Sequence, residues 1–325
     1  MKAAIYRRFG PPDVVKIEEV PKPTPKPNEV LTRIHAASVS IADHRLRAKD
    51  LPEGLGFFGP LALGVFRPRK KLLGMDGAGV VEAIGDKVTK FQPGDEVYFL
   101  PGASFGCHAE YIAMAETDFI ALKPKNLNFA EATSLLFGGT TSLNYLRRKP
   151  VKPGDEVLVN GASGSCGNAA VQLAKHMGAT VTGVCSAKNA DLVRSLGADH
   201  VIDYAVEDFA TSGKTYDVIV ECVGNAPFER VNDAIKPGGA LLIIIPNLKA
   251  ILFSKRRSRK TGKLITASDW KATVEDLEYL AKLAEEGVLK PVIDSIYPLE
   301  DIVQAHARVD TGHKVGNVLV TMEHD

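Results

Sequence analysis

The chain has 325 residues, of which 45% are hydrophobic and 24% charged, and its formal net charge is +1. This composition is that of an ordinary globular protein, and the length is long for one domain and natural for two. A near-neutral charge excludes a strong general attraction to nucleic acid or to a membrane surface, and no run of about 18 uninterrupted apolar residues predicts a spanning helix.

The N-terminal residues favour a cytoplasmic location. Residues 1–6 run directly into Arg7 and Arg8, without the apolar core of a secretory signal. The four cysteines lie far apart, and no pair has the spacing of a metal finger. We therefore expect free thiols in packed positions, as is usual in a reducing compartment.

Residues 1–124 predict a small β-barrel rather than a layered α/β domain. Short apolar or alternating runs, such as Val30–His35, Gly79–Ile84 and Glu96–Leu100, are separated by turn-forming residues. The proline-rich stretch Pro21–Pro27 is one of these interruptions. A first domain dominated by strands follows from this pattern.

The pattern changes near residue 126, where strands and helices begin to alternate. Asn128 fits a helix N-cap, and Glu131 three residues later completes a capping box. The predicted strands are Glu156–Asn160, Thr180–Cys185, His200–Ile202, Asp217–Cys222, Ala240–Ile245 and Leu264–Ala267. Their alternation with helices predicts a parallel sheet with right-handed crossovers over residues 125–267.

The C-terminal part of the chain contains a basic run and then returns to strand-like patterns. The run Lys255–Lys260 is expected to be a solvated loop; a targeting or nucleic-acid patch, or a contribution to the field around a phosphorylated cofactor, are the alternatives. A helix is expected over Lys271–Glu286, followed by short β-like runs in Val292–Thr321. We expect residues 268–325 to fold back onto the first domain.

A glycine-rich turn after the strand Glu156–Asn160 is the most informative segment. It contains Gly161, Gly164 and Gly167 and leads into a predicted helix over Asn168–Met177. A strand, a turn without Cβ atoms and a helix N-terminus expose backbone N–H groups to an anion and let a pyrophosphate approach closely. The residues predicted to bind a dinucleotide here are Gly161, Ala162, Ser163, Gly164, Ser165, Cys166 and Gly167.

Within that turn, Cys166 has two interpretations. It is either a small apolar filler or a thiol whose pKa is lowered by the helix N-terminus.

The end of the second strand predicts NADPH rather than NADH. An NAD site usually places Asp or Glu about 20 residues past the glycine turn. Ser186, Lys188 and Asn189 stand there instead, and the first acid is Asp191. Lys188 supplies a positive charge, and its two neighbours can donate hydrogen bonds to a 2′-phosphate. The alternative is that Lys188 only begins a solvated helical turn.

With these residues in view, the chain resembles the medium-chain dehydrogenase/reductase superfamily over nearly its full length. Its closest similarity is to the zinc-independent, quinone oxidoreductase-like branch, which includes zeta-crystallin and the mitochondrial reticulon-4-interacting homologue. The segments that carry the resemblance are Gly74–Val81, Pro93–Val97, Ala109–Tyr111, Gly161–Gly167, Leu196–Asp199, Val201–Tyr204 and Leu299–Ile302. The resemblance implies an α/β protein with a GroES-like β-barrel catalytic domain and a six-stranded, doubly wound Rossmann sheet, with the active site between them.

The resemblance also implies cofactor contacts. Thr141 matches the threonine that faces the nicotinamide in this branch, and Tyr204 matches a tyrosine beside the adenosine 2′-phosphate. Val223 and Ile245 follow the fourth and fifth strands, where the cofactor of the family lies. Lys314 is expected either to reach the cofactor end of the cleft or to be a solvated surface lysine.

The positions that hold zinc in metal-dependent relatives are occupied differently in this chain. Ser40 stands where those enzymes use Cys, and Met75-Asp76 stands where they carry His-Glu. A hydroxyl and a thioether are poor ligands for Zn²⁺. The four-cysteine structural lobe of those relatives is reduced to Cys107. We therefore predict that the protein binds no metal.

The expected chemistry follows from the absence of a Lewis acid. An alcohol is then hard to activate, whereas a quinone or an α,β-unsaturated carbonyl accepts hydride readily. We expect NADPH-dependent reduction of a small hydrophobic acceptor of this kind. Two alternatives stay open: zinc-free reduction of an aldehyde or ketone, and a non-catalytic NADPH-binding protein with a structural, assembly or RNA-binding role. A homodimer is expected from the resemblance alone.

The polar residues expected near the substrate are Ser40, Asp43 and His44. Asp43 either acts there or holds a loop by hydrogen bonds to backbone. His44 either lines the cleft and donates a proton or is an ordinary, partly exposed polar residue. This chain departs from the quinone-reductase pattern at Ser40, commonly Asn, and at Arg45, commonly Tyr.

The segment Leu51–Lys71 follows directly and is rich in apolar residues, among them Phe57 and Phe58, with basic residues behind them. We expect an apolar lid or wall for a hydrophobic substrate. Plain packing over the barrel, or a subunit contact, is the alternative.

Overall fold

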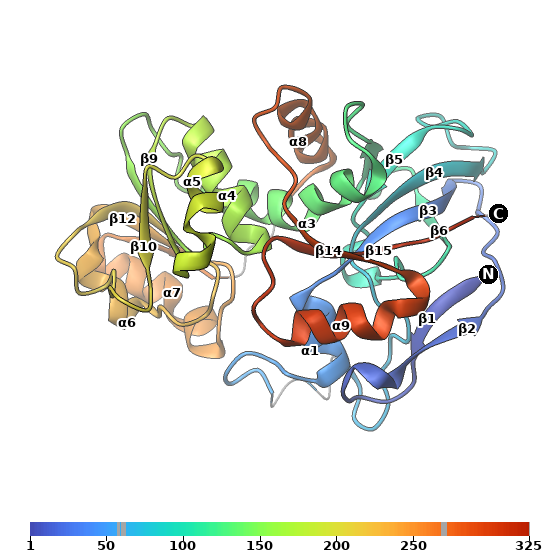
Figure 1. Cartoon of the computed structure of the whole chain (residues 1–325), viewed down its shortest axis with the longest axis horizontal. Helices are drawn as coiled ribbons and strands as arrows, with labels where there is room; N and C mark the ends of the chain where they lie inside the picture. Colours follow the sequence, from blue (N-terminus) through green and yellow to red (C-terminus); the bar gives the residue numbers. More distant parts are fainter. Residues whose placement is uncertain (57–58, 60–62, 268–271, 325) are drawn as a thin grey trace.

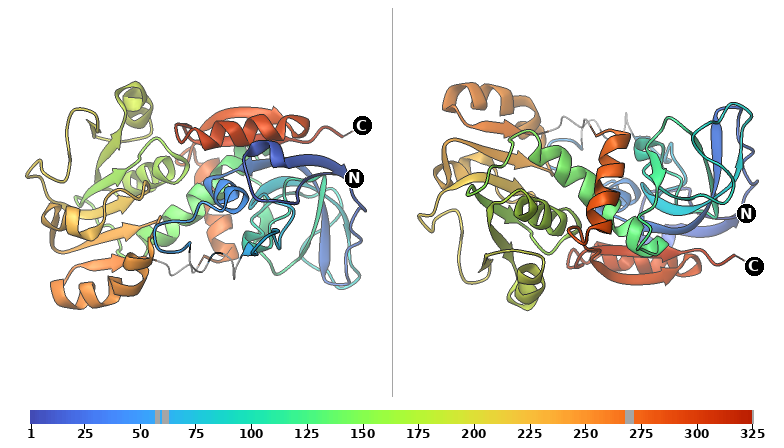
Figure 2. Two further views of the ribbon diagram at one scale, coloured as in Figure 1. Left: turned by 90° about the horizontal axis from the view of Figure 1, so that it is seen from below. Right: turned by 90° about the horizontal axis from the view of Figure 1, so that it is seen from above.

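The structure is a computed structural model that describes residues 1–56, 59, 63–267 and 272–324. Two lobes lie side by side, with helices α3 (Phe129–Leu146) and α8 (Val274–Glu285) between them (Figure 1). The two further views in Figure 2 show the same arrangement. Within the described residues, no helix is long and apolar enough to cross a lipid bilayer.

One lobe, called the antiparallel lobe below, is built on a seven-stranded sheet of order β14-β15-β3-β4-β5-β7, with β6 paired to β3. The strands are β3 (Glu29–Val39), β4 (Gly77–Ile84), β5 (Glu96–Phe99), β6 (Tyr111–Ala115), β7 (Ile120–Leu122), β14 (Ile293–Pro298) and β15 (Asn317–Thr321). The C-terminal strand β15 pairs antiparallel with β3, so the end of the chain lies in the sheet of the N-terminal residues. A separate pair, β1 (Lys2–Tyr6) and β2 (Val15–Glu19), completes this lobe.

The other lobe, called the parallel lobe, contains a six-stranded sheet of order β10-β9-β8-β11-β12-β13. Its strands are β8 (Glu156–Asn160), β9 (Thr180–Cys185), β10 (His200–Asp203), β11 (Tyr216–Glu221), β12 (Ile235–Ile243) and β13 (Leu264–Thr266). All neighbouring pairs are parallel, which confirms the predicted doubly wound sheet. Only β12 begins clearly earlier than predicted.

The core of the parallel lobe follows from the alternation of side chains along each strand. Val157 and Val159 of β8 pack into one hydrophobic cluster, and Leu158 between them packs into another on the opposite face. All three are fully buried. A strand apolar on both faces must be covered by helices on both sides, as in a doubly wound sheet. The helices of this lobe are α4 (Ser165–His176), α5 (Ala190–Ser195), α6 (Phe228–Val231) and α7 (Leu248–Thr261).

The predicted start of α3 is confirmed by its hydrogen bonds. The Glu131 N–H donates to Asn128 Oδ1 at 2.9 Å, and the Asn128 N–H donates to Glu131 Oε2 at 2.9 Å. This capping box fixes the start of α3, the helix that lies between the two lobes.

The structure corrects two expectations. The basic run Lys255–Lys260 lies in helix α7 and not in a loop, because the Asn247 side chain caps the first turn and Gly262, at φ 70°, ends the helix. The tail also holds a helix, α9 (Ile302–Asp310), among its strands. The buried residues of α9 recur at helical spacing, but the helix is short and lies between two strand-like runs, which masked the pattern in the sequence.

The lobes are joined where β15 begins. The Gly316 N–H donates to the Ser163 carbonyl at 2.8 Å, and Gly316 forms a parallel bridge with Gly164. The glycine turn of the parallel lobe is therefore tied by backbone to the last strand of the antiparallel lobe.

Asn317, the first residue of β15, extends this joint with its side chain. Its Nδ2 donates to the Ser134 carbonyl at 2.9 Å and to the Val292 carbonyl at 3.1 Å. Its Oδ1 accepts from Ser165 Oγ at 2.7 Å. One buried amide thus connects β15, α3 and the first residue of α4.

Replacing Asn317 by Ala is expected to lower the free energy of unfolding by about 2–4 kcal/mol, because it removes three side-chain hydrogen bonds from a buried joint. Urea unfolding followed by circular dichroism measures the loss. Asn126→Ala is the matched control, since that amide makes a single 3.0 Å bond to the Ala284 carbonyl. An equal loss in both variants would contradict a special role for Asn317.

Candidate active site

Helix α1 (Ile41–Ala48) carries the predicted catalytic residues, and Ser40 caps it. The backbone N–H and the hydroxyl of Ser40 donate to Asp43 Oδ2 at 2.8 and 2.7 Å. The other carboxylate oxygen of Asp43 accepts from the Gly74 N–H at 2.8 Å. Asp43 is fully buried, so its carboxylate is used in holding α1 against the loop at Gly74.

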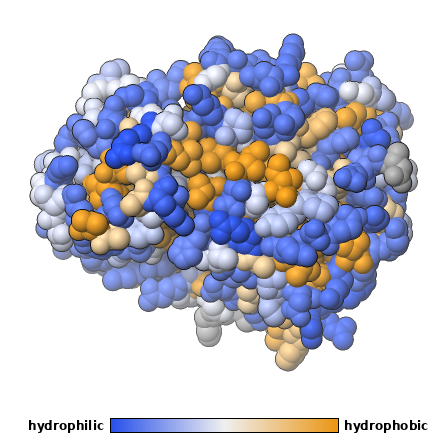
Figure 3. Space-filling model, viewed as in Figure 1, coloured by the Kyte–Doolittle hydropathy of each residue, from blue (hydrophilic) through white to orange (hydrophobic). Residues whose placement is uncertain are grey.

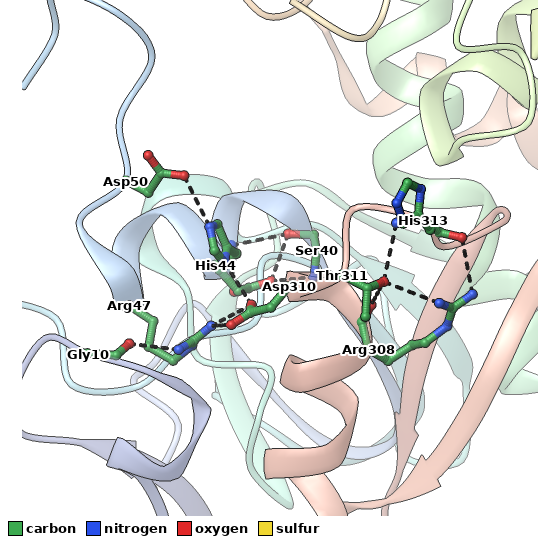
Figure 4. Close-up of polar contacts among 10 residues, drawn as sticks. Gly10, Ser40, His44, Arg47, Asp50, Arg308, Asp310, Thr311 and His313 are labelled. Atoms are coloured by element: carbon green, nitrogen blue, oxygen red, sulfur yellow. Dashed lines mark hydrogen bonds and ion pairs between the residues drawn. The ribbon is translucent and has the colours of Figure 1, made fainter. Parts of the chain in front are cut away.

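His44 points from α1 toward the end of α9 (Figure 4). Its Nδ1 lies 2.6 Å from Asp310 Oδ1, and its Nε2 lies 3.3 Å from Asp50 Oδ2. Both ring nitrogens therefore face carboxylates, an arrangement in which a protonated imidazole can donate from each nitrogen. The Asp50 side chain is 71% exposed, against 17% for His44, so Asp50 links His44 to solvent.

Arg47, one turn further along α1, is fully buried and binds the same carboxylate, that of Asp310. Its Nη2 donates to both Asp310 oxygens at 2.6 Å, and its Nη1 donates to the Gly10 carbonyl at 2.7 Å. A guanidinium paired in this bidentate way holds the Asp310 carboxylate beside His44.

Asp76, which stands at a zinc-ligand position of metal-dependent relatives, is a buried acid. The Ser38 hydroxyl donates to its Oδ1, and the Phe137 N–H of α3 donates to its Oδ2 at 3.2 Å. Burial raises the pKa of Asp76 to about 7, and the nearby charge of Asp43 adds to the shift. The feature of the sequence that could have identified Asp76 is an acidic residue within the apolar, glycine-rich segment just before β4.

The glycine turn has the shape of an anion cradle. Gly161 adopts φ +82°, and a Cβ at Gly167 would lie 2.0 Å from the Gly161 carbonyl oxygen. Around Gly164, the N-cap of α4, an added Cβ would meet, among the described residues, only that same oxygen, at 3.4 Å. The turn is therefore tightly packed on one side and open at the helix N-terminus, where an anion is favoured.

Ala162 and Cys166 are two predicted members of the turn, the first fully buried and the second partly buried. Ala162 is fully buried, and its N–H donates to the Val184 carbonyl at 2.9 Å. Burial raises the pKa of the Cys166 thiol to about 11, and the positive charge of Lys314 offsets this only in part. The interpretation of Cys166 as an activated thiol is therefore wrong. All four cysteines are free.

Thr141 and Lys314 lie beside the turn. Thr141 Oγ1 is buried and makes no hydrogen bond of ordinary geometry among the described residues, although it lies close enough to the Cys166 thiol to lower that group's pKa slightly. The Lys314 ammonium donates to the Gly316 carbonyl at 2.6 Å, and burial lowers its pKa. A buried hydroxyl without a partner and a desolvated cation next to an open cradle fit an anionic, hydrogen-bonding cofactor.

The predicted 2′-phosphate residues gather at the carboxyl ends of β9 and β10. Asn189 Nδ2 donates to Ser163 Oγ of the glycine turn at 3.1 Å, and the Tyr204 N–H donates to the Cys185 carbonyl at 3.2 Å. The Tyr204 side chain is 61% exposed. Lys188 is exposed and forms no ion pair with any described residue, and Ser186 precedes it at the strand end.

The ends of β11 and β12 close the same edge of the sheet. A Cβ at Gly161 would lie 2.7 Å from Val223 Cγ2, and a Cβ at Gly224 would lie 3.4 Å from Ile245 Cγ2. Glu221 organises this corner, because it accepts from Asn160 Nδ2 at 3.0 Å and from the backbone of residues 223 and 224. Burial raises the pKa of Glu221. Sequence reasoning missed this residue, since its partners are known only from the fold.

The segment after α1 reaches the parallel lobe. The Leu248 N–H of α7 donates to the Glu53 carbonyl at 3.0 Å, and Gly54 lies against the Leu248 side chain. Phe57 and Phe58, on which the lid expectation depends, lie outside the described residues. Figure 3 shows apolar surface in the middle of the molecule, where the lobes meet.

The site therefore has two parts. The predicted cofactor residues lie together at the carboxyl edge of the parallel sheet, at the reversal of strand order where such sheets bind ligands. The predicted catalytic residues lie on α1 in the other lobe, and α3 carries both Thr141 and the contact to Asp76. Among the described residues, no group of three or more His, Cys, Asp or Glu side chains is placed to hold a metal ion.

Comparison with known proteins agrees with this geometry. Residues 26–125 match the alcohol dehydrogenase GroES-like domain, and residues 196–320 match the zinc-binding dehydrogenase family. The chain is 32% identical to the chloroplast envelope quinone oxidoreductase homolog of Arabidopsis thaliana, over 93% of this chain and 92% of that protein. It is also 32% identical to the NADPH-dependent alkenal/one oxidoreductase of the same plant, over 98% of this chain and 79% of that protein.

The same similarity extends to solved structures. The quinone oxidoreductase from Coxiella burnetii superposes with a TM-score of 0.88 and 32% identity, over 99% of both chains.

Asp76 makes stability depend on pH. Between its ordinary pKa of 3.8 and about 7, the unfolded chain has released the proton that the folded protein retains. The free energy of unfolding therefore falls as pH rises through this window, by up to about 1.4 kcal/mol per pH unit. Asp76→Asn should flatten this part of the profile, measured by urea unfolding at a series of pH values.

The exposed acid Asp86 supplies the control for that measurement, and Asp86→Asn should retain the wild-type slope. A profile that stays as steep in Asp76→Asn as in the wild type would show that another group causes it.

Proposed function

We propose that this protein reduces a quinone or an α,β-unsaturated carbonyl compound with NADPH. The chain belongs to the quinone oxidoreductase-like branch of the medium-chain dehydrogenase/reductase superfamily. The observation that carries the proposal is the open glycine cradle with the unpartnered Thr141 hydroxyl beside it. NADPH supplies the hydride for the reduction.

The residues of the parallel lobe bind and orient the cofactor in this proposal. The N–H groups at the start of α4 face the pyrophosphate, and Lys314 adds a positive charge there. Lys188, Asn189 and Tyr204 receive the 2′-phosphate at the end of β9. Thr141 gives its free hydroxyl to the nicotinamide end, which fixes the face from which hydride leaves.

The residues of α1 serve the acceptor. In this proposal Ser40 and Asp43 hold the first turn of α1 near the acceptor, so Asp43 is a positioning residue. His44 supplies the proton that the reduced acceptor needs, and Asp50 connects His44 with water. Ser40 and Met75 offer a hydroxyl and a thioether where zinc ligands would be required, so the proposed reaction uses no metal.

We also propose a cytoplasmic homodimer. β13 is the edge strand of the parallel sheet, with β12 on one side, and an open edge can pair with a second copy. The four free thiols suit a reducing compartment.

The function is tested by the oxidation of NADPH and NADH with benzoquinone, phenanthrenequinone, an alkenal and a simple aldehyde. Turnover is expected with the quinones or the alkenal, with a higher kcat/KM for NADPH than for NADH, because Lys188 complements the 2′-phosphate and no carboxylate replaces it. Reduction of the aldehyde alone would show that the protein is instead a zinc-free aldehyde or ketone reductase. Tight NADPH binding without any turnover would establish a non-catalytic protein.

The role of Thr141 is tested by Thr141→Val, which replaces an unsatisfied hydroxyl by a methyl group of the same shape. The stability of the free protein should be unchanged or slightly higher, whereas the affinity for NADPH should fall by about tenfold, as expected for one lost hydrogen bond. Thr266→Val is the matched control, because Thr266 Oγ1 is also buried without a partner among the described residues but lies on edge strand β13. Equal NADPH affinity in the two variants, measured by fluorescence titration, would refute the assignment.

A further inference from the structure

A cavity of about 530 Å³ opens on the antiparallel lobe, between the β1–β2 pair and the segment that follows Val65. None of its described lining residues belongs to the proposed cofactor or catalytic sites. Five of them are basic, namely Arg7, Arg8, Lys16, Arg67 and Lys71, against two acids, Asp13 and Glu18. The pair β1–β2 lies on the side of the molecule away from the parallel lobe (Figure 1).

The fold brings the basic side chains together from three segments. Ile5 of β1 pairs with Lys16 of β2, so that residues 5 and 7 share a face of the ribbon with residues 16 and 18. The Tyr6 N–H donates to the Lys71 carbonyl at 2.9 Å, and Ile5 forms a bridge with Leu72. The segment ending at Lys71 therefore runs alongside β1 and forms the third wall.

The positive charge of the cavity is not neutralised within the described part of the chain. Arg7 forms a bidentate pair with Glu18, at 3.0 and 2.6 Å. Arg8, Lys16 and Arg67 form no ion pair and no side-chain hydrogen bond with a described residue. Like charges that line one hollow repel each other, and a bound anion removes that repulsion.

The apolar part of the lining indicates what kind of anion would fit. Ile5 and Val14 form a buried floor, with exposures of 8% and 6%, whereas Phe66 at the rim is 90% exposed. An aromatic ring held in water beside cations offers a stacking face to a planar group.

We propose that this cavity is a second ligand site, separate from the cofactor cleft, for a small organic phosphate that carries a planar ring. The phosphoryl group contacts Arg8, Lys16 and Arg67, and the ring lies against Phe66. Arg and Lys in a common cavity are the side chains that bind phosphate oxygens best.

Calorimetric titration of the full chain, saturated with NADP⁺, tests the proposal with three probes. AMP carries both ring and phosphate, inorganic pyrophosphate carries charge alone, and adenosine carries the ring alone. We expect one further equivalent of AMP to bind, with pyrophosphate weaker and adenosine weakest. The double variant Arg8→Gln/Lys16→Gln should weaken AMP by about tenfold or more, as for the loss of charge-assisted hydrogen bonds.

Phe66→Ala separates the ring contact from the charge contact. It should weaken AMP and leave pyrophosphate unchanged. The KM for NADPH should stay at the wild-type value in every cavity variant, since none of these residues lies in the cofactor site.

The matched control is Lys214→Gln/Arg256→Gln, which removes two exposed cations that lie outside the cavity and form no ion pair with a described residue. It should leave AMP binding intact. An equal loss in the control would show that only the general field of the protein attracts anions. The absence of saturable AMP binding to the wild-type protein at millimolar concentration would overturn the proposal outright.

Discussion

The structure depends on a backbone joint between the two lobes, where Gly316 donates to Ser163 of the glycine turn. Gly316 adopts φ +71°, and a Cβ there would lie 2.2 Å from the Val292 carbonyl oxygen, so a side chain is sterically excluded at this point. The turn must remain bare on the side that receives an anion, and it can be anchored only on the other. Because the anchor is the backbone before β15, the position of the proposed cofactor cradle is fixed relative to the antiparallel sheet.

Helix α3 connects this backbone joint to the centre of the molecule. An added Cβ at Gly138 would lie 2.3 Å from the Ser165 carbonyl oxygen, so α3 and the start of α4 are in direct contact. The Ser142 hydroxyl donates to the Cys166 carbonyl at 2.7 Å on the same side. Thr141 lies between these two contacts in sequence, and its orientation is therefore set by packing on both sides. The Phe137 N–H, one turn earlier, binds Asp76, which joins α3 to the other lobe.

Local patterns in the sequence were sufficient to predict the parallel sheet but not the backbone joint between the two lobes. The strands β8 and β9 were predicted residue for residue, because an apolar run followed by a glycine turn has few alternative structures. Helix α7 was missed because its cations resemble a solvated loop, although Asn247 and Gly262 mark its ends. The bond from Asn317 to Ser134 spans 183 positions, and no pattern of neighbouring residues contains it. The pKa shift of Asp76 depends likewise on what the fold places around it.

The replacement of the zinc-ligand positions has a structural consequence that bears on the chemistry. In this chain Asp43 binds the Gly74 N–H and Asp76 binds the Phe137 N–H, so the stretch from Gly74 to Asp76 is held by hydrogen bonds at both ends. The Asp43 and Asp76 side chains thus connect α1 and α3 through this stretch, and their oxygen atoms are already engaged in hydrogen bonds. In the proposed reaction, such a site orients the acceptor and His44 supplies a proton, without a metal ion to polarise the carbonyl. An acceptor that brings its own conjugation suits this arrangement best, and conjugation is the property that distinguishes quinones and enones from simple ketones.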